Sequence, residues 1–145
     1  MSGMAYDDSN IFARILRGEL PSHRVYEDEH TVAFMDVMPQ AEGHVLVLPK
    51  TPSRNILDIG AHELQSLMIS VQHVARAVVK AFDAEGVTIM QFAEPAGGQT
   101  VFHTHVHVIP RFAGEPLKAH TGKMADNELL ADQAFQIRAV LDGGG

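Results

Sequence analysis

The spacing of apolar and polar residues along the chain predicts three helices. The longest covers about 61–82, where apolar side chains recur with helical periodicity at Leu64, Leu67, Met68, Val71, Ala75, Val78 and Phe82. A short helix is predicted from Asn10, a good N-cap residue, to about Arg17, and Gly18 ends it. The third helix is predicted over 128–141.

Strand patterns lie between these helices. Segments 25–27 and 31–36 flank a polar loop and predict a β-hairpin. The almost continuous apolar run 44–48 predicts a central strand covered on both faces and ended by Pro49. β-Branched and aromatic residues predict two further strands, at 87–92 and 100–109.

This order of elements does not alternate strand and helix as a parallel sheet requires, so it favours the α+β class. We expect a single domain with a mostly antiparallel five-stranded sheet and flanking helices. Residues 1–9 are predicted to be disordered, 10–111 to form the domain, and 112–145 to add a loop and a helix packed on it.

Composition excludes several classes of protein. Eleven basic against 18 acidic residues give a net charge of -7 without a basic cluster, which argues against a nucleic acid duplex as partner. The chain has no cysteine and therefore neither disulfides nor thiolate metal sites. It has no apolar run long enough for a membrane span and no signal-like start, so we expect a cytoplasmic protein without a membrane partner.

The chemically distinctive stretch is 101–111, where His103, His105 and His107 alternate with other residues. Side chains alternate between the two faces of a strand, so the three imidazoles are predicted to share one face. Phe102, Thr104, Val106 and Val108 are then predicted to share the opposite, core-facing side.

Such a face favours either a metal site or phosphoryl chemistry. Strand positions i and i+4 are about 13 Å apart, so the three histidines do not easily share one ion, and zinc would need His44 or His120 as a further ligand. For phosphoryl transfer, His105 would be a neutral nucleophile and His107 the proton donor to the leaving group.

Upstream, Gly97 and Gly98 are followed by Gln99 and Thr100. Glycines let backbone N–H groups approach a phosphate closely, and a following hydroxyl can donate as well. Taken alone, a glycine pair also fits an ordinary tight turn.

Segment 102–109 resembles the motif of the histidine triad nucleotide-binding family, His-φ-His-φ-His-φ-φ with φ apolar, and as in that family it follows Gly-Gly-Gln-Thr. Segments 10–21, 33–40 and 43–50 are also similar to the family's segments and occur in the same order. The resemblance extends over about 10–111.

The resemblance implies a homodimeric purine nucleotide hydrolase or nucleotidyl transferase, closest to the Hint-like branch that cleaves nucleoside 5′-phosphoramidates and related nucleotidyl conjugates. His105 would form a covalent nucleotidyl-histidine, His107 would contact the phosphate and the leaving group, and His103 and His44 would support them. The implied nucleotide contacts are Asp36 at the ribose, Gly98, Gln99 and Thr100 at the phosphate, and Ile11, Phe12, Ile15, Phe34 and Val37 around the base.

Other interpretations stay open. From the residues alone, Phe12, Ile15 and Phe34 also fit a plain apolar core, and Asp36 fits a turn. Many relatives bind a structural zinc through cysteines, which this chain lacks, so we expect neither a metal nor another cofactor. Ala93 stands where relatives often carry an asparagine, which predicts weakened turnover. The alternative functions are a dinucleoside polyphosphate hydrolase, a non-catalytic nucleotide sensor, and a metal-dependent enzyme.

Overall fold

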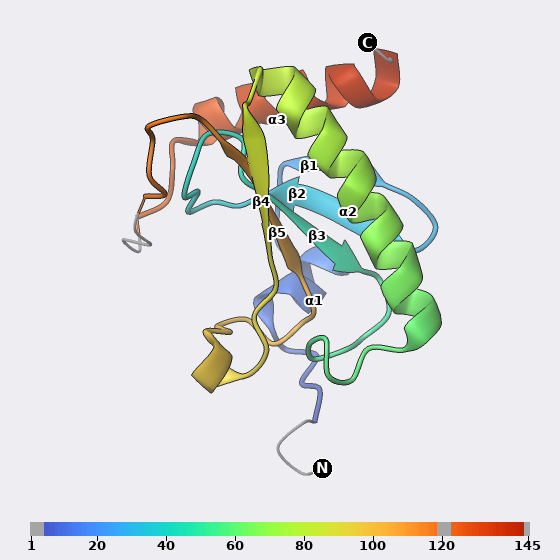
Figure 1. Ribbon diagram of the computed structural model, residues 1–145. Coiled ribbons are helices and arrows are strands. Elements are labelled where there is room, and N and C mark those ends of the chain that lie inside the picture. Colours follow the sequence, from blue (N-terminus) through green and yellow to red (C-terminus); the bar gives the residue numbers. More distant parts are fainter. Residues whose placement is uncertain (1–4, 119–122, 144–145) are drawn as a thin grey trace.

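The computed structural model describes residues 5–118 and 123–143, and within them it has one antiparallel five-stranded sheet in the order β1-β2-β3-β5-β4 (Figure 1). The strands are β1 (Arg24–Glu27), β2 (Thr31–Met35), β3 (Val45–Pro49), β4 (Gly86–Met90) and β5 (Val106–Arg111). The helices are α1 (Ile11–Leu16), α2 (Ala61–Phe82), α3 (Asn127–Gly143) and the short 3-10 turn η2 (Pro95–Gly97). The α+β class, the hairpin and the antiparallel sheet are confirmed.

The sheet separates two apolar clusters because alternate residues of each strand point to opposite faces. On one face, side chains such as Ala33, Val47 and Val108 pack with α2 and α3. On the other, Phe34, Leu46 and Leu48 pack with Phe12 and Ile15 of α1. Every residue of β3 is buried, which confirms the prediction of a central strand covered on both faces.

Helix boundaries agree closely with the sequence patterns. The Asn10 side chain accepts a hydrogen bond from the Ala13 N–H and so caps α1 as predicted. α2 has the predicted length, but Met68 is 43% exposed, so its assignment to the apolar face is wrong. The buried stripe of α2 is centred instead on Leu67, Val71, Val74 and Val78.

The largest correction concerns the predicted strand 100–109. β5 begins only at Val106, and residues 101–105 are irregular, so His103 and His105 do not lie on a strand. Thr104 bonds to Ser53 through its backbone N–H, at 2.9 Å, and through its hydroxyl, at 2.6 Å, in place of a strand neighbour. Phe102 does not join the core, because its ring lies under the Arg54 guanidinium. Val106 and Val108 do face the core as predicted.

Of residues 1–9, for which disorder is predicted, the structure describes residues 5–9. Tyr6 contacts His103, and Asp7 accepts hydrogen bonds from the Ser9 backbone and hydroxyl. Residues 1–4 of that segment lie outside the described residues. The same holds for residues 144–145 and for His120.

Asp28 fastens the β1–β2 hairpin to α2. Its carboxylate accepts hydrogen bonds from the backbone N–H groups of His30 and Thr31 and from the hydroxyls of Tyr26 and Ser70. Partial burial acts to raise the pKa of Asp28, but these hydrogen bonds together lower it to about 2. The hairpin is therefore held against α2 at the start of β2.

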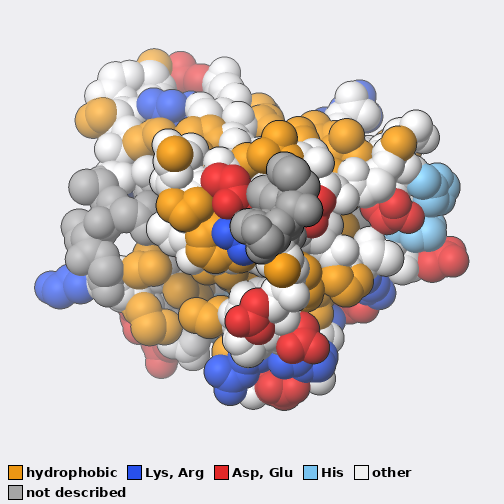
Figure 2. Space-filling model, turned by 90° about the horizontal axis from the view of Figure 1, so that it is seen from below, with side chains coloured by type: hydrophobic (Ala, Val, Ile, Leu, Met, Phe, Trp, Pro, Cys, Tyr) orange, Lys and Arg blue, Asp and Glu red, His pale blue; other side chains and the backbone are white. Residues whose placement is uncertain are grey.

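Charged groups are mixed on the surface that Figure 2 shows, where lysine and arginine side chains lie among aspartate and glutamate. No helix in the described part of the chain is both long enough and apolar enough to cross a membrane.

Candidate active site

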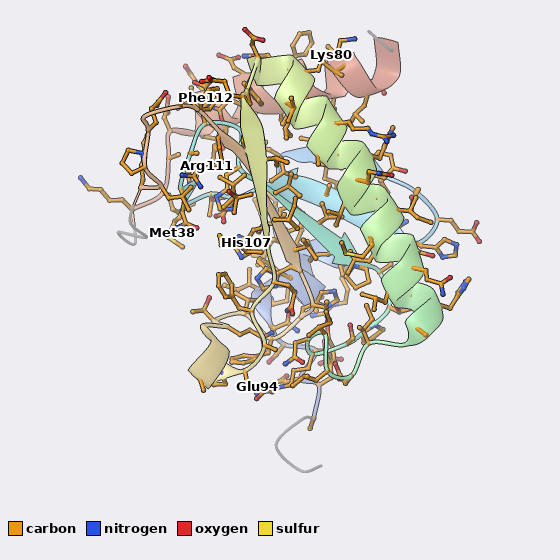
Figure 3. The ribbon with its side chains drawn as sticks, in the orientation of Figure 1. Met38, Lys80, Glu94, His107, Arg111 and Phe112 are labelled. Carbon is orange, nitrogen blue, oxygen red and sulfur yellow. The ribbon has the colours of Figure 1, made fainter. Side chains whose placement is uncertain are left out.

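Four buried histidines converge on the α1 side of the sheet. His44 immediately precedes β3 and His107 lies on β5, and these neighbouring strands pair Leu46 with His107. His103 and His105 come from the irregular segment before β5. Their exposed fractions are 0% for His44, 1% for His103, 5% for His105 and 7% for His107. In the view of Figure 3, Met38 lies to the left of His107 and Glu94 lies below it.

The hydrogen bond of His105 determines which of its nitrogens can react. Its Nδ1 lies 2.7 Å from the backbone oxygen of His103. A carbonyl oxygen only accepts, so Nδ1 carries the hydrogen and, in the neutral ring, Nε2 carries the lone pair. Burial lowers the pKa of His105 to about 4, and the nearby His103 contributes in the same direction. The ring is therefore neutral at pH 7 and has a nucleophilic Nε2.

His107 takes the opposite tautomer through His44. The Gln40 backbone N–H donates to Nδ1 of His44 at 3.0 Å, so the hydrogen of a neutral His44 is on Nε2. That nitrogen lies 2.9 Å from Nδ1 of His107, which must accept. A neutral His107 thus carries its hydrogen on Nε2. The rings of His105 and His107, 5.2 Å apart between centroids, present a lone pair and a proton donor next to one another.

Asp36 lies behind this pair. Its Oδ1 accepts the Met38 N–H at 2.9 Å, and its Oδ2 is 3.4 Å from Nε2 of His44 and 4.0 Å from Nδ1 of His107. Only 6% of Asp36 is exposed, and its carboxylate faces the imidazoles. Its contact with ribose stays a prediction.

Asp36, His44 and His107 could also hold a metal ion. One ligand atom each from Asp36, His44 and His107 lies within 4.8 Å of the others, and among the described residues this is the group of ligands with such spacing. A metal there would displace the hydrogen on Nε2 of His44. Of the three histidines in the motif, His107 belongs to this group among the described residues.

Aromatic rings contact His105 and His107. Phe12 meets the His105 ring edge to face at 4.8 Å, and Phe34 packs on Phe12 at 5.6 Å. Phe92 meets His107 in the same manner at 5.4 Å, a contact that the sequence did not reveal. Of the other predicted base contacts, Ile11 is 52% exposed and Ile15 is buried in the α1 cluster.

Two further predicted contacts lie elsewhere. Val37 packs against the cluster on the α2 side of the sheet. Residues 94–100, which include Gly97 and Gly98, are called the glycine loop below. Thr100, at the end of this loop, is exposed. The structure therefore brings Phe12 to His105, and the nucleotide contacts of all these residues stay predictions.

The glycine loop is held by polar side chains rather than open to a ligand along its whole length. Gln99 accepts from the Glu94 N–H and from the Asn55 amide, and it donates to the carbonyls of Arg54 and Val101. All the hydrogen-bonding groups of its side chain are therefore engaged within the protein, and the phosphate contact of Gln99 stays a prediction. Gly98, with φ +97°, supplies the positive φ that the turn needs.

Glu94 and Arg54 complete this support. The Arg54 guanidinium bonds both carboxylate oxygens of Glu94, at 2.7 and 3.1 Å, and Asn55 donates to the same carboxylate at 2.7 Å. These contacts hold Glu94 at φ +67°, a backbone angle that non-glycine residues rarely adopt. This ion pair could not be predicted from the sequence pattern, because Arg54 and Glu94 are 40 positions apart.

Comparison with known proteins places this geometry in a family. The family model described as HIT domain matches residues 17–114. A crystal structure of a Hit-like protein involved in cell-cycle regulation, from Bartonella henselae, is 51% identical, with a TM-score of 0.88 and coverage of 93% of this chain and 98% of that one. A hypothetical histidine triad nucleotide-binding protein from Sulfolobus tokodaii is 30% identical, with a TM-score of 0.83 and 90% coverage of both chains.

A curated relative carries the name of an enzyme. Adenylylsulfatase HINT3 from Arabidopsis thaliana is 31% identical over 120 residues, which are 79% of this chain and 61% of that protein. The resemblance to the histidine triad family is thereby confirmed.

The lowered pKa of His105 predicts a loss of stability in mild acid. An unfolded histidine titrates near 6.5 and the folded His105 near 4, so between these values the unfolded chain binds more protons. The contribution is fully present above pH 6.5 and is lost as pH falls to about 4, by about 3 kcal/mol at ~1.4 kcal/mol per pH unit. Urea unfolding of the wild type and His105→Gln between pH 7.5 and 4 measures it. The variant should lose about 3 kcal/mol less than the wild type, and equal losses would contradict the assignment.

Proposed function

The chain belongs to the HIT domain family, and on this premise we propose that it is an enzyme that binds purine nucleotides and hydrolyses nucleoside 5′-phosphoramidates or related nucleotidyl conjugates. The observation that carries the proposal is the pair of complementary tautomers, with a lone pair on Nε2 of His105 and a hydrogen on Nε2 of His107. A nucleophile beside a proton donor is what a two-step substitution at phosphorus requires.

In the first step, Nε2 of His105 attacks the α-phosphorus and forms a P–N bond, while the bond from phosphorus to the leaving nitrogen breaks. For this step His107 is protonated on both ring nitrogens, so the leaving amine takes the proton of Nε2 and His107 becomes a neutral imidazole. In the second step, water attacks phosphorus and gives its proton back to His107, and the bond to His105 breaks to release the nucleoside monophosphate. The hydrogen bond from Nδ1 of His105 to the His103 carbonyl stabilises the positive charge on the nucleotidyl-imidazole.

Substrate contacts are assigned by the family motif together with the positions of the side chains. Phe12 is next to the nucleophile and would pack against the nucleotide, with Ile11 exposed beside it. The backbone around Gly98 and the Thr100 hydroxyl would hold the phosphate. Asp36 would accept hydrogen bonds from the ribose hydroxyls. Phe92 contacts His107, and the next residue, Ala93, stands where relatives often carry an asparagine, so we expect weakened turnover.

The covalent intermediate is the first test. Incubation with an adenosine phosphoramidate and rapid acid-free quenching should give a protein heavier by one adenylyl group in intact-mass spectra. His105→Ala should abolish both adduct and product, because it removes the nucleophile. His62→Ala, which changes an exposed histidine at the start of α2, is the matched control and should keep both. Absence of adduct and product in the wild type would refute the proposed enzyme.

The role of His107 is tested by changing the leaving group. An amine must be protonated to leave, whereas sulfate is a weak base and leaves without a proton. His107→Gln should therefore slow phosphoramidate hydrolysis by about 100-fold or more, the usual contribution of a general acid. In the same variant, hydrolysis of adenylyl sulfate should slow by less than about tenfold. The name of the Arabidopsis relative suggests this class of substrate. Equal losses for both substrates in steady-state assays would reject His107 as the proton donor.

The alternative functions give different outcomes in the same assays. A nucleotide sensor would bind AMP or GMP without turnover. A metal-dependent enzyme using Asp36, His44 and His107 would lose activity with a chelator, whereas the proposed enzyme retains it. A dinucleoside polyphosphate hydrolase would prefer a nucleotide as its leaving group.

We also propose that the protein is a homodimer. β4 is an edge strand of the sheet, and Val87 and Ile89 on it are 37% and 41% exposed. An uncapped apolar edge strand readily pairs with another chain, and a second copy would pair with it symmetrically. The cytoplasmic location and the absence of nucleic acid and membrane partners stay predictions.

Light scattering after size exclusion measures the dimer. The wild type should have about twice the 15.8 kDa of one chain. Ile89→Lys should give the mass of one chain, because an inserted lysine discourages edge pairing. Phe135→Lys on α3, where an apolar ring is 66% exposed, is the control and should leave the dimer intact. A monomeric wild type, or a dimeric Ile89→Lys, would reject this interface.

A further inference from the structure

The described start of the chain packs against the histidine site. The Tyr6 hydroxyl lies 2.6 Å from Nδ1 of His103, and the two rings meet edge to face at 5.7 Å. The Ala5 carbonyl accepts from Arg54 at 3.3 Å, and the Asp8 carbonyl accepts from Arg17 at 2.8 Å. In Figure 1 this segment runs below α1. It is thus bonded both to α1 and to the residues behind the nucleophile.

The direction of the bond between Tyr6 and His103 follows from the other nitrogen of His103. Nε2 lies 2.9 Å from the carbonyl oxygen of Pro49, which only accepts, so the hydrogen of His103 is on Nε2. Nδ1 is then an acceptor, and Tyr6 is its donor. Burial raises the pKa of Tyr6, which keeps the hydroxyl protonated for this purpose, and burial lowers the pKa of His103, which keeps the ring neutral.

His103 is in turn the residue whose carbonyl oxygen holds Nδ1–H of His105 at 2.7 Å. Its ring is therefore fixed at both nitrogens while its backbone selects the tautomer of the nucleophile. Because His103 is 1% exposed, water does not readily replace the Tyr6 donor.

We propose that Tyr6 is a positioning residue for the nucleophile, whose hydroxyl fixes the His103 ring and with it the carbonyl that keeps the reactive lone pair on Nε2 of His105. The importance of this role for catalysis rests on the proposed function, whereas the effect on the imidazoles does not.

The surroundings of Tyr6 support this role. Arg54, which donates to the carbonyl of neighbouring Ala5, also covers the Phe102 ring at 4.2 Å and binds Glu94 of the glycine loop. The N-terminal segment therefore reaches the loop through Ala5 and the nucleophile through Tyr6. Phe102 and His103 are adjacent, so both contacts act on the same short piece of irregular backbone.

Tyr6→Phe tests the proposal because it removes the hydroxyl and keeps the ring. The chain has 2 tyrosines, and Tyr26→Phe is the matched control, since the Tyr26 hydroxyl bonds to Asp28 in the hairpin. Proteins labelled with ¹⁵N-histidine report the tautomer of each ring by NMR, and a His103→Gln spectrum assigns the His103 signals.

In Tyr6→Phe, we expect the His103 Nδ1 resonance to move toward that of a nitrogen without a donor and the Nδ1–H tautomer of His105 to become less populated. We expect kcat for the phosphoramidate to fall about tenfold, the rate equivalent of about 1.4 kcal/mol, with KM changed less than about twofold. Tyr26→Phe should lower the urea midpoint and leave the His103 and His105 spectra and kcat at the wild-type values.

An unchanged His105 tautomer in Tyr6→Phe would overturn the proposal, as would a loss of kcat in Tyr26→Phe equal to that in Tyr6→Phe. If the wild type has no turnover, the proposed function fails by itself. The NMR comparison then still decides whether Tyr6 positions His105.

Discussion

The site depends on one hydrogen bond, from Nδ1–H of His105 to the backbone carbonyl of His103. It fixes which nitrogen carries the lone pair, and burial keeps the ring neutral so that this lone pair is present at pH 7. The acceptor is a backbone atom, so the path of the chain selects the tautomer. The carbonyl of a residue in a strand is normally used by the neighbouring strand, and the irregular path of residues 101–105 leaves that of His103 to the imidazole.

The bonds that keep this path irregular come from distant parts of the chain. Ser53 holds both the backbone and the hydroxyl of Thr104, and the Pro49 carbonyl holds the His103 ring. Every polar group of the Gln99 side chain is hydrogen-bonded, to Glu94 and Val101 nearby and to Arg54 and Asn55 from a distant segment. Buried polar groups that are fully paired favour one backbone arrangement, because each alternative leaves a donor or acceptor unpaired. The loop is thus ordered before any ligand binds.

The sheet supplies the second constraint. His44 and His107 meet because β3 and β5 are paired in the register that places Leu46 opposite His107. A shift by one residue would move His107 to the α2 face, where apolar side chains pack. The alternation of side chains along β3 and β5 therefore fixes the strand register, and this register sets both the core packing and the contact between His44 and His107. The rings of Phe12 and Phe92 then pack edge to face against His105 and His107.

The sequence by itself determined the α+β class, the hairpin, the central strand, α2 and the cap on α1, because these features depend on local periodicity and on the residues at element ends. It also determined the family, through the histidine motif and three segments in order. Tertiary structure decided where β5 begins, because the Thr104 N–H donates to the Ser53 carbonyl and the strand starts only at Val106. It also decided the proton positions. A tautomer is set by the partner of the second ring nitrogen, and His44 lies 63 positions from His107 and Tyr6 lies 97 from His103, distances over which spacing carries no information.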